Sequence, residues 1–90
     1  MSEVKITLKG SFSNRDASVD EKALALAGVG GSQSATTTFG GPGEHKLKWS
    51  VTGAPGARYT VSIAGDCEAW TEDFTMPSGR DAGFKRFHVR

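Results

Sequence analysis

Hydrophobic and polar residues alternate along much of this chain, which is the pattern of a β-strand with one buried and one exposed face. The clearest segments are 44–52 and 58–64, and the turn-forming residues 53–57 separate them. Pro55-Gly56 suits a type II turn, because proline fixes one backbone torsion and glycine accepts the positive one that follows. The pattern therefore predicts a β-hairpin over 44–64.

Further alternation predicts that the whole chain is mainly β. Val4, Ile6 and Leu8 share one face of a first strand, which Phe12 extends, and residues 13–16 then form a polar turn. Six or seven short strands of this kind predict a small antiparallel β-sandwich, immunoglobulin-like or similar, as a single domain over residues 1–90. The other strands are expected at 35–39, within 67–76 and at 84–89, with turns at 28–34, 40–43, 65–66 and 78–83.

One segment supports a sandwich by resemblance. Trp49 followed by Tyr59-Thr60-Val61 resembles the second and third strands of fibronectin type III and related immunoglobulin-like modules. The resemblance is confined to this segment, and it implies a sandwich fold but no activity, ligand or site residue.

Residues 18–27 fit two structures. Ser18 with Glu21 three residues later resembles a helix capping box, and the Ala/Leu run at 23–27 has high helix propensity. The same segment also alternates, because Lys22, Leu24 and Leu26 are separated by alanines. The sequence leaves a short helix and a strand equally open here.

Charge and cysteine content limit the classes of partner and the cellular compartment that we expect for this protein. The 11 basic and 10 acidic residues give a net charge of +1, which argues against nucleic-acid or membrane binding driven by a basic surplus. Residues 1–20 are too often charged for a signal peptide or a membrane span. Cys67, the single cysteine, cannot form an internal disulfide, so we expect a reducing compartment and a cytoplasmic protein.

No motif indicates an enzyme or a cofactor. The glycine-rich run 28–33 lacks the third glycine of a dinucleotide fingerprint, because Gln33 stands in its place, and it predicts a flexible connection instead. Asp66 and Glu68 flank Cys67 and should raise its pKa, which is the opposite of what a nucleophile requires. We therefore expect a protein that is not an enzyme and needs no cofactor.

The candidate site lies at 66–73. Asp66, Glu68, Glu72 and Asp73 place four carboxylates close together, and such a cluster either binds calcium or simply faces solvent. Trp70 lies between Glu68 and Glu72 and is either a stacking platform for a ligand or a sheet-packing residue. The predicted ligand-binding residues are therefore Trp70, Glu68 and Glu72.

Three functions fit these observations. The first is a non-catalytic protein-interaction module of unknown partner, suggested by small size, glycine-rich loops and the absence of a catalytic constellation. The second is a carbohydrate-binding module, with or without calcium, which rests on Trp70 and the acidic cluster. The third is a structural assembly subunit whose edge strands pair between copies.

Overall fold

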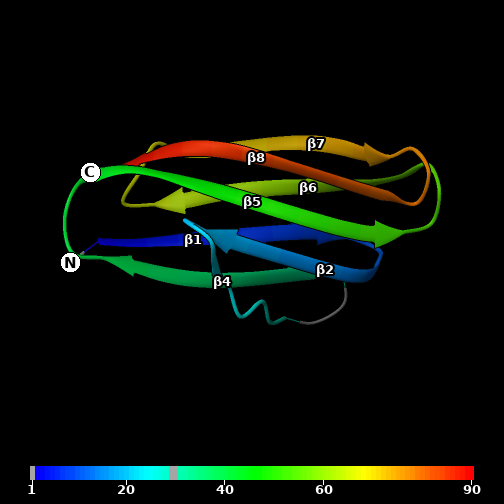
Figure 1. Ribbon diagram of the computed structural model, residues 1–90, viewed down its shortest axis with the longest axis horizontal. Coiled ribbons are helices and arrows are strands. Elements are labelled where there is room, and N and C mark those ends of the chain that lie inside the picture. The colour runs from blue at the N-terminus through cyan, green and yellow to red at the C-terminus, as the bar shows by residue number, and fades with distance from the viewer. Residues whose placement is uncertain (1, 29–30) are drawn as a thin grey trace.

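This computed structural model describes residues 2–28 and 31–90, which form eight β-strands packed as two antiparallel sheets (Figure 1). One sheet has the strand order β4-β1-β6-β7 and the other β3-β2-β5-β8. The predicted small antiparallel β-sandwich is therefore confirmed, with eight strands in place of six or seven. The strands are β1 (Ser2–Gly10), β2 (Phe12–Val19), β3 (Lys22–Ala23), β4 (Ser32–Phe39), β5 (Gly43–Gly53), β6 (Ala57–Gly65), β7 (Trp70–Met76) and β8 (Arg80–Val89).

The predicted hairpin over 44–64 is wrong, although its two strands and its turn are right. β5 pairs with β2 and β8, whereas β6 pairs with β1 and β7, so the connection between them crosses from one sheet to the other. In that connection the Ala57 N–H donates to the Ala54 carbonyl at 3.1 Å, and Gly56 has a φ of 79°, as a type II turn requires. Alternation identifies the buried face of a strand, but it does not identify the partner strand.

Four other connections among the described residues also change sheet: β1 to β2, β3 to β4, β4 to β5, and β7 to β8. The first of them sets this sandwich apart from an immunoglobulin domain. In the immunoglobulin arrangement the first two strands are neighbours in one sheet. Among the described residues, no helix is long and apolar enough to cross a membrane.

The polar turn predicted at 13–16 is instead part of β2. The connection lies earlier, at Ser11, which separates the end of β1 from the start of β2. The interior side of β2 carries Arg15, whose Nη2 donates to Gln33 Oε1 at 2.7 Å across the sandwich. An inward-facing charged residue interrupts the apolar alternation, and this is why the sequence pattern missed the strand.

The helix alternative for 18–27 is wrong, because the segment contains a tight hairpin between β2 and β3. Asp20 and Glu21 have φ values of 49° and 69°, the left-handed values of a type I′ turn. The Asp20 carboxylate accepts the Lys46 N–H at 3.1 Å and lies 2.5 Å from His45 Nδ1, an interaction that lowers the pKa of Asp20. These contacts fix the hairpin to β5.

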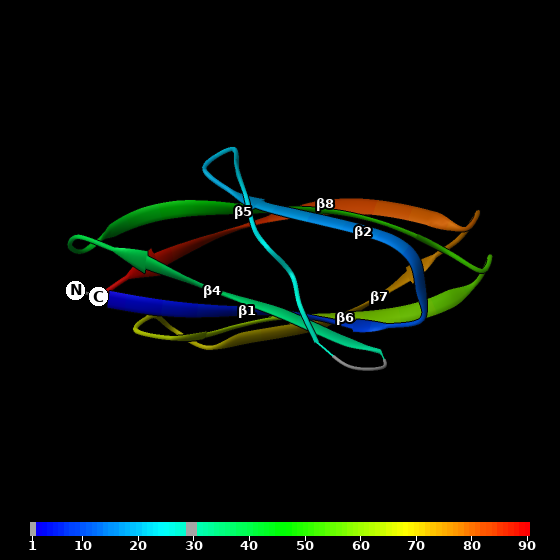
Figure 2. The same ribbon diagram turned by 90° about the horizontal axis from the view of Figure 1, so that it is seen from below.

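After this hairpin the chain crosses to the other sheet. Residues 24–27 run from the β2 layer to the β4 layer (Figure 2). Ala27 and Ser34 exchange two backbone hydrogen bonds at 3.0 and 2.9 Å, which join the crossing segment to β4. Val29 and Gly30, which belong to the glycine-rich loop expected at 28–34, lie outside the described residues, and β4 already begins at Ser32.

Replacing Glu21 with glycine should stabilise the protein by about 0.5–1 kcal/mol, because glycine adopts a positive φ without steric cost. The ion pair lost with Glu21 is a long one, since 3.9 Å separates its Oε1 from Lys48 Nζ, and both side chains are exposed. Chemical denaturation measures the change. Glu44→Gly is the matched control, because Glu44 is an exposed glutamate inside regular β5 and its replacement should destabilise. A destabilised Glu21→Gly variant would contradict the hairpin geometry.

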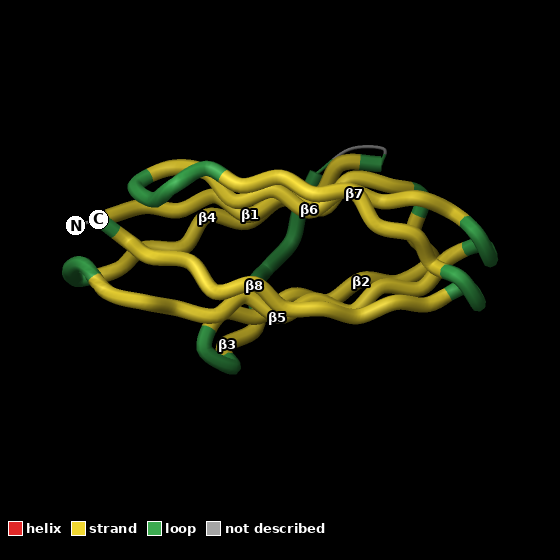
Figure 3. The backbone as a smooth tube through the Cα atoms, turned by 90° about the horizontal axis from the view of Figure 1, so that it is seen from above, coloured by secondary structure: helices red, strands yellow, loops and turns green. Residues whose placement is uncertain are grey.

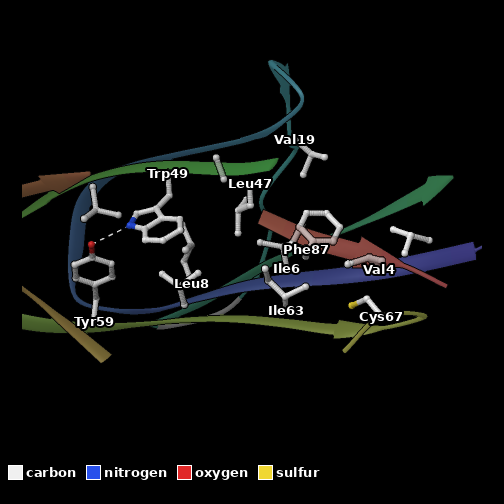
Figure 4. Close-up of a cluster of buried hydrophobic side chains, with 14 of the residues drawn as sticks. Val4, Ile6, Leu8, Val19, Leu47, Trp49, Tyr59, Ile63, Cys67 and Phe87 are labelled. Atoms are coloured by element: carbon white, nitrogen blue, oxygen red, sulfur yellow. Dashed lines mark hydrogen bonds between the residues drawn. The ribbon is translucent and has the colours of Figure 1, made fainter. Parts of the chain in front are cut away.

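The core fills the space between the two sheets (Figure 4). Trp49 is 4 % exposed, as the sequence predicts, and its Nε1 donates to the Tyr59 hydroxyl at 2.9 Å. Tyr59 in turn donates to Asp81 Oδ2 at 2.5 Å. This network joins β5, β6 and β8, so it ties the two sheets together through hydrogen bonds as well as apolar contact.

Burial, together with the hydrogen bond to Asp81, raises the pKa of Tyr59 well above its usual value of about 10. The stability that depends on neutral Tyr59 is therefore complete below about pH 10 and is lost as the pH rises toward the folded-state pKa. Tyr59 is the single tyrosine, so tyrosinate absorbance reports it alone. We expect that absorbance to appear together with loss of native tryptophan fluorescence. Titration near pH 10 in a protein that is still folded would contradict this environment.

Candidate functional site

Trp70 lies on the interior side of edge strand β7, where it is half-buried. Its ring centroid is 6.2 Å from that of Trp49 and 6.4 Å from that of Phe74, and Lys85 Nζ lies 5.3 Å from the same ring. Most of the indole therefore packs against neighbouring side chains inside the sandwich. One part of it still faces a hollow at the open side of the sandwich.

That hollow, the Trp70 pocket, has a volume of about 380 Å³ and lies at the edge of the sandwich, between β8 and the segment that leads into β7. It brings together two of the three predicted ligand-binding residues, Trp70 and Glu68, while Glu72 lies outside its lining. Its complete lining is Glu44, Glu68, Ala69, Trp70, Lys85, Arg86, Phe87 and His88.

The four carboxylates of the acidic cluster do not converge. Asp66 accepts the Glu3 N–H at 2.8 Å, and Asp73 accepts the Thr60 hydroxyl at 2.7 Å. Glu72 and Asp73 are successive residues of β7 and therefore point to opposite faces. In residues 2–28 and 31–90, no group of three or more His, Cys, Asp or Glu side chains is arranged to hold a metal ion. The calcium site thus stays a prediction without geometric support.

Cys67 is 3 % exposed and pairs as an isolated bridge with Val89. Burial is the main cause that raises the pKa of its thiol, while Asp66 adds to the effect and Arg90 opposes it. A buried, protonated thiol is a poor nucleophile.

A larger hollow of about 640 Å³ lies on the outer face of the β3-β2-β5-β8 sheet, and sequence reasoning missed it. We call it the outer groove. It is open to solvent along its length, and its walls are mostly apolar. The residues that line it are Asp16, Ala17, Ser18, Ala23, Leu24, Lys48, Trp49, Ser50, Ala82, Gly83 and Phe84.

Strand register explains the shape of this groove. Asp16, Ser50 and Ala82 lie opposite one another on β2, β5 and β8, so short side chains form the floor. One wall comes from Leu24 and the β3 hairpin, which projects from the outer side of the sheet (Figure 3). Phe84 on β8 forms the opposite wall. About 14 Å separates β3 from β8, since neighbouring strands are about 4.8 Å apart.

Phe84 is the most unusual residue of the groove, because its side chain is large, apolar and 61 % exposed. Lys46 Nζ lies 4.8 Å from the centre of its ring, and Lys48 is its cross-strand partner on β5. The sequence did contain a signal for this exposure. Phe87 and Val89 share the buried face of the last strand, so Phe84 has to point the other way.

The outer groove places polar and apolar groups side by side. The described lining holds one carboxylate, one ammonium group, two hydroxyls and an exposed aromatic ring, and it contains no histidine or cysteine. Convergent polar groups on an apolar, preformed hollow fix the orientation of a ligand.

No known protein family matches the sequence, and no curated protein does either. The fold is similar to the crystal structure of a domain of unknown function, DUF4425, from Bacteroides vulgatus. The TM-score is 0.54 at 11 % sequence identity, and the similarity covers 99 % of this chain and 95 % of that one. At this identity the similarity extends to the fold alone.

Proposed function

We propose that this protein is a non-catalytic interaction module that binds a protein partner in the outer groove. The observation that carries the proposal is Phe84, a 61 % exposed phenylalanine beside a hollow of about 640 Å³. A large apolar side chain continuous with a groove is typical of a binding surface, whereas isolated exposed apolar residues are ordinary.

The groove has the composition expected of a binding hot spot. Leu24 and Phe84 are apolar groups on opposite walls, and the short floor between them leaves room for a side chain of the partner. Asp16 and Lys48 supply polar contacts at the rim. Anchors of this kind contribute most of the affinity of an interface, and the polar rim contributes specificity.

The scaffold supports binding without rearrangement. β5 supplies Lys48 and Ser50 to the groove, and it is hydrogen-bonded on both sides, to β2 and to β8. Side chains on a strand that is paired on both sides are held more firmly than side chains on a loop. We therefore expect the free and bound groove to differ little in backbone.

Two groove variants test the proposal. Phe84→Ser removes the anchor, and Ala82→Arg fills the floor of the groove. Thr36→Arg is the matched control, because Thr36 is exposed on β4 in the opposite sheet. Proteins retained from a cell extract by the immobilised wild type are purified, and calorimetry measures their affinity for each variant. Both groove variants should weaken binding by at least about tenfold, which corresponds to about 1.4 kcal/mol.

Circular dichroism and thermal denaturation should show that all three variants are folded, since every substituted residue is exposed. A partner that binds both groove variants as tightly as the wild type would overturn the proposal. Loss of binding in Thr36→Arg alone would place the interface on the other sheet.

A carbohydrate in the Trp70 pocket is a second candidate. The observation that favours it is the part-exposed indole beside Glu68 and Lys85 in a hollow of about 380 Å³. A sugar could stack on the ring while the two charged groups form hydrogen bonds with its hydroxyls. Thermal shift with simple sugars should then show stabilisation that Glu68→Gln reduces. A panel without any shift would exclude this function.

A further inference from the structure

We infer that the partner of the outer groove presents an acidic segment in which carboxylates lie next to an apolar side chain. The inference rests on the proposed function, because it assigns the chemistry of the occupant to that same groove. The juxtaposition of three cations with the exposed ring of Phe84 carries it.

The cations come from two neighbouring strands and point outward on one face. Lys46 and Lys48 alternate along β5, and Arg86 lies two residues beyond Phe84 on β8. In the register of the sheet Lys48 is opposite Phe84, and Lys46 is opposite Arg86. Directly opposed side chains are about 5 Å apart at Cβ, so all three cationic residues are neighbours of Phe84 on one side, and Lys46 Nζ lies 4.8 Å from the centre of its ring.

Folding alone does not explain this arrangement. Like charges directly opposite each other destabilise a sheet, and Lys46 and Arg86 form such a pair. Within the described parts of the chain, neither side chain forms an ion pair, and Lys48 has only a 3.9 Å contact with Glu21. The nearby Asp20 is already paired with His45. A partner that brings carboxylates to Lys46 and Arg86 would relieve the repulsion.

Cations outnumber carboxylates at the outward positions of the three long strands of this sheet. These positions carry the cations Lys46, Lys48, Arg80 and Arg86 and the carboxylates Asp16 and Glu44. Asp20 and Glu21 of the β2–β3 hairpin lie beside Lys46 and Lys48, so the excess of positive charge is local to the part of β5 and β8 next to Phe84. An acidic segment is attracted to that part of the face.

Other anionic partners fit less well. Single-stranded nucleic acids bind grooves with several stacking aromatic rings, whereas Phe84 is the single large apolar residue that the described surface exposes. A membrane surface requires a broad apolar face beside the cations. Asp16 in the groove can accept a backbone N–H of a peptide, a donor that neither a nucleic-acid phosphate nor a lipid phosphate offers.

Selection from a random peptide library on the immobilised full chain tests the inference. Enriched peptides should carry aspartate or glutamate next to an apolar residue. Their affinity should fall by at least about tenfold in the double variant Lys46→Glu/Arg86→Glu and should weaken as salt is raised. Lys5→Glu/Lys9→Glu is the matched control, because it makes the same charge change on exposed residues of β1 in the other sheet and should bind nearly as well.

The outcomes separate this inference from the proposed function. Peptides that depend on Phe84 but have no acidic bias would overturn the acidic partner and leave the groove as the binding site. If no selected peptide loses affinity when Phe84 is replaced, both the acidic partner and the outer groove as the binding site are overturned. Parallel titrations use phosphatidylserine vesicles and oligothymidine, and saturable binding of either one without any acidic peptide would also overturn the inference.

Discussion

Replacing Tyr59 with phenylalanine should lower the free energy of unfolding by about 3 kcal/mol. The hydroxyl accepts the Trp49 Nε1–H at 2.9 Å and donates to Asp81 at 2.5 Å, and phenylalanine can do neither. The Trp49 donor would then be buried without a partner, and the Asp81 carboxylate would lose its donor in a half-buried position. Since domains are stable by about 5–15 kcal/mol, the loss is a large fraction of the total.

Chemical denaturation followed by tryptophan fluorescence measures this change. Asp81→Asn is the matched control, because asparagine keeps an oxygen that can accept the Tyr59 hydroxyl, and it should cost about 1 kcal/mol or less. Equal stabilities of Tyr59→Phe and the wild type would contradict a network that ties β5, β6 and β8 together.

Replacing Gly83 with alanine should cost about 2–4 kcal/mol, which is opposite in sign to the usual effect of this substitution within a strand. A Cβ at Gly83 would lie 2.5 Å from Trp49 Cζ2 and 2.9 Å from Cε2. The indole occupies the space that a side chain on β8 would otherwise fill. To make room, the ring would have to leave its position, and its hydrogen bond to Tyr59 would break.

Gly43→Ala is the matched control for this second prediction. Gly43 begins β5, and a Cβ there would meet only His45 Nε2 at 3.8 Å, an ordinary contact. That variant should be as stable as the wild type or slightly more stable, whereas Gly83→Ala should unfold at lower denaturant and lose near-ultraviolet dichroism of Trp49. A Gly83→Ala variant as stable as Gly43→Ala would show that the indole can move without cost.

The sequence predicts strands well where one face is wholly apolar. Val4, Ile6 and Leu8 in β1 and the buried residues of β5 and β6 all follow a period of two, and all are found in the core. β2 was missed because Arg15 points inward, and the pairing of β5 with β8 was missed because it joins segments far apart in the chain. Periodicity is a local property, whereas pairing depends on the whole topology.

The candidate site was harder to predict for the same reason. Trp70 was predicted as a ligand-binding residue because acidic residues flank it in sequence, but in the fold its ring packs against Trp49 and Phe74. The outer groove combines short segments of four strands, and no one of them is unusual alone. Phe84 could have been found from its phase relative to Phe87, but its neighbours Lys46 and Lys48 became apparent only once β5 and β8 were paired.

Nuclear magnetic resonance of the isotope-labelled protein, titrated with a peptide selected on the wild type, tests the binding site most directly. If the outer groove is that site, amide shifts should change on the β2-β5-β8 face, with the largest changes around Lys48, Ala82 and Phe84. The outer face of β1 and β4 should stay unchanged. Changes centred on Trp70 and Glu68 would contradict binding in the outer groove and place the site in the Trp70 pocket.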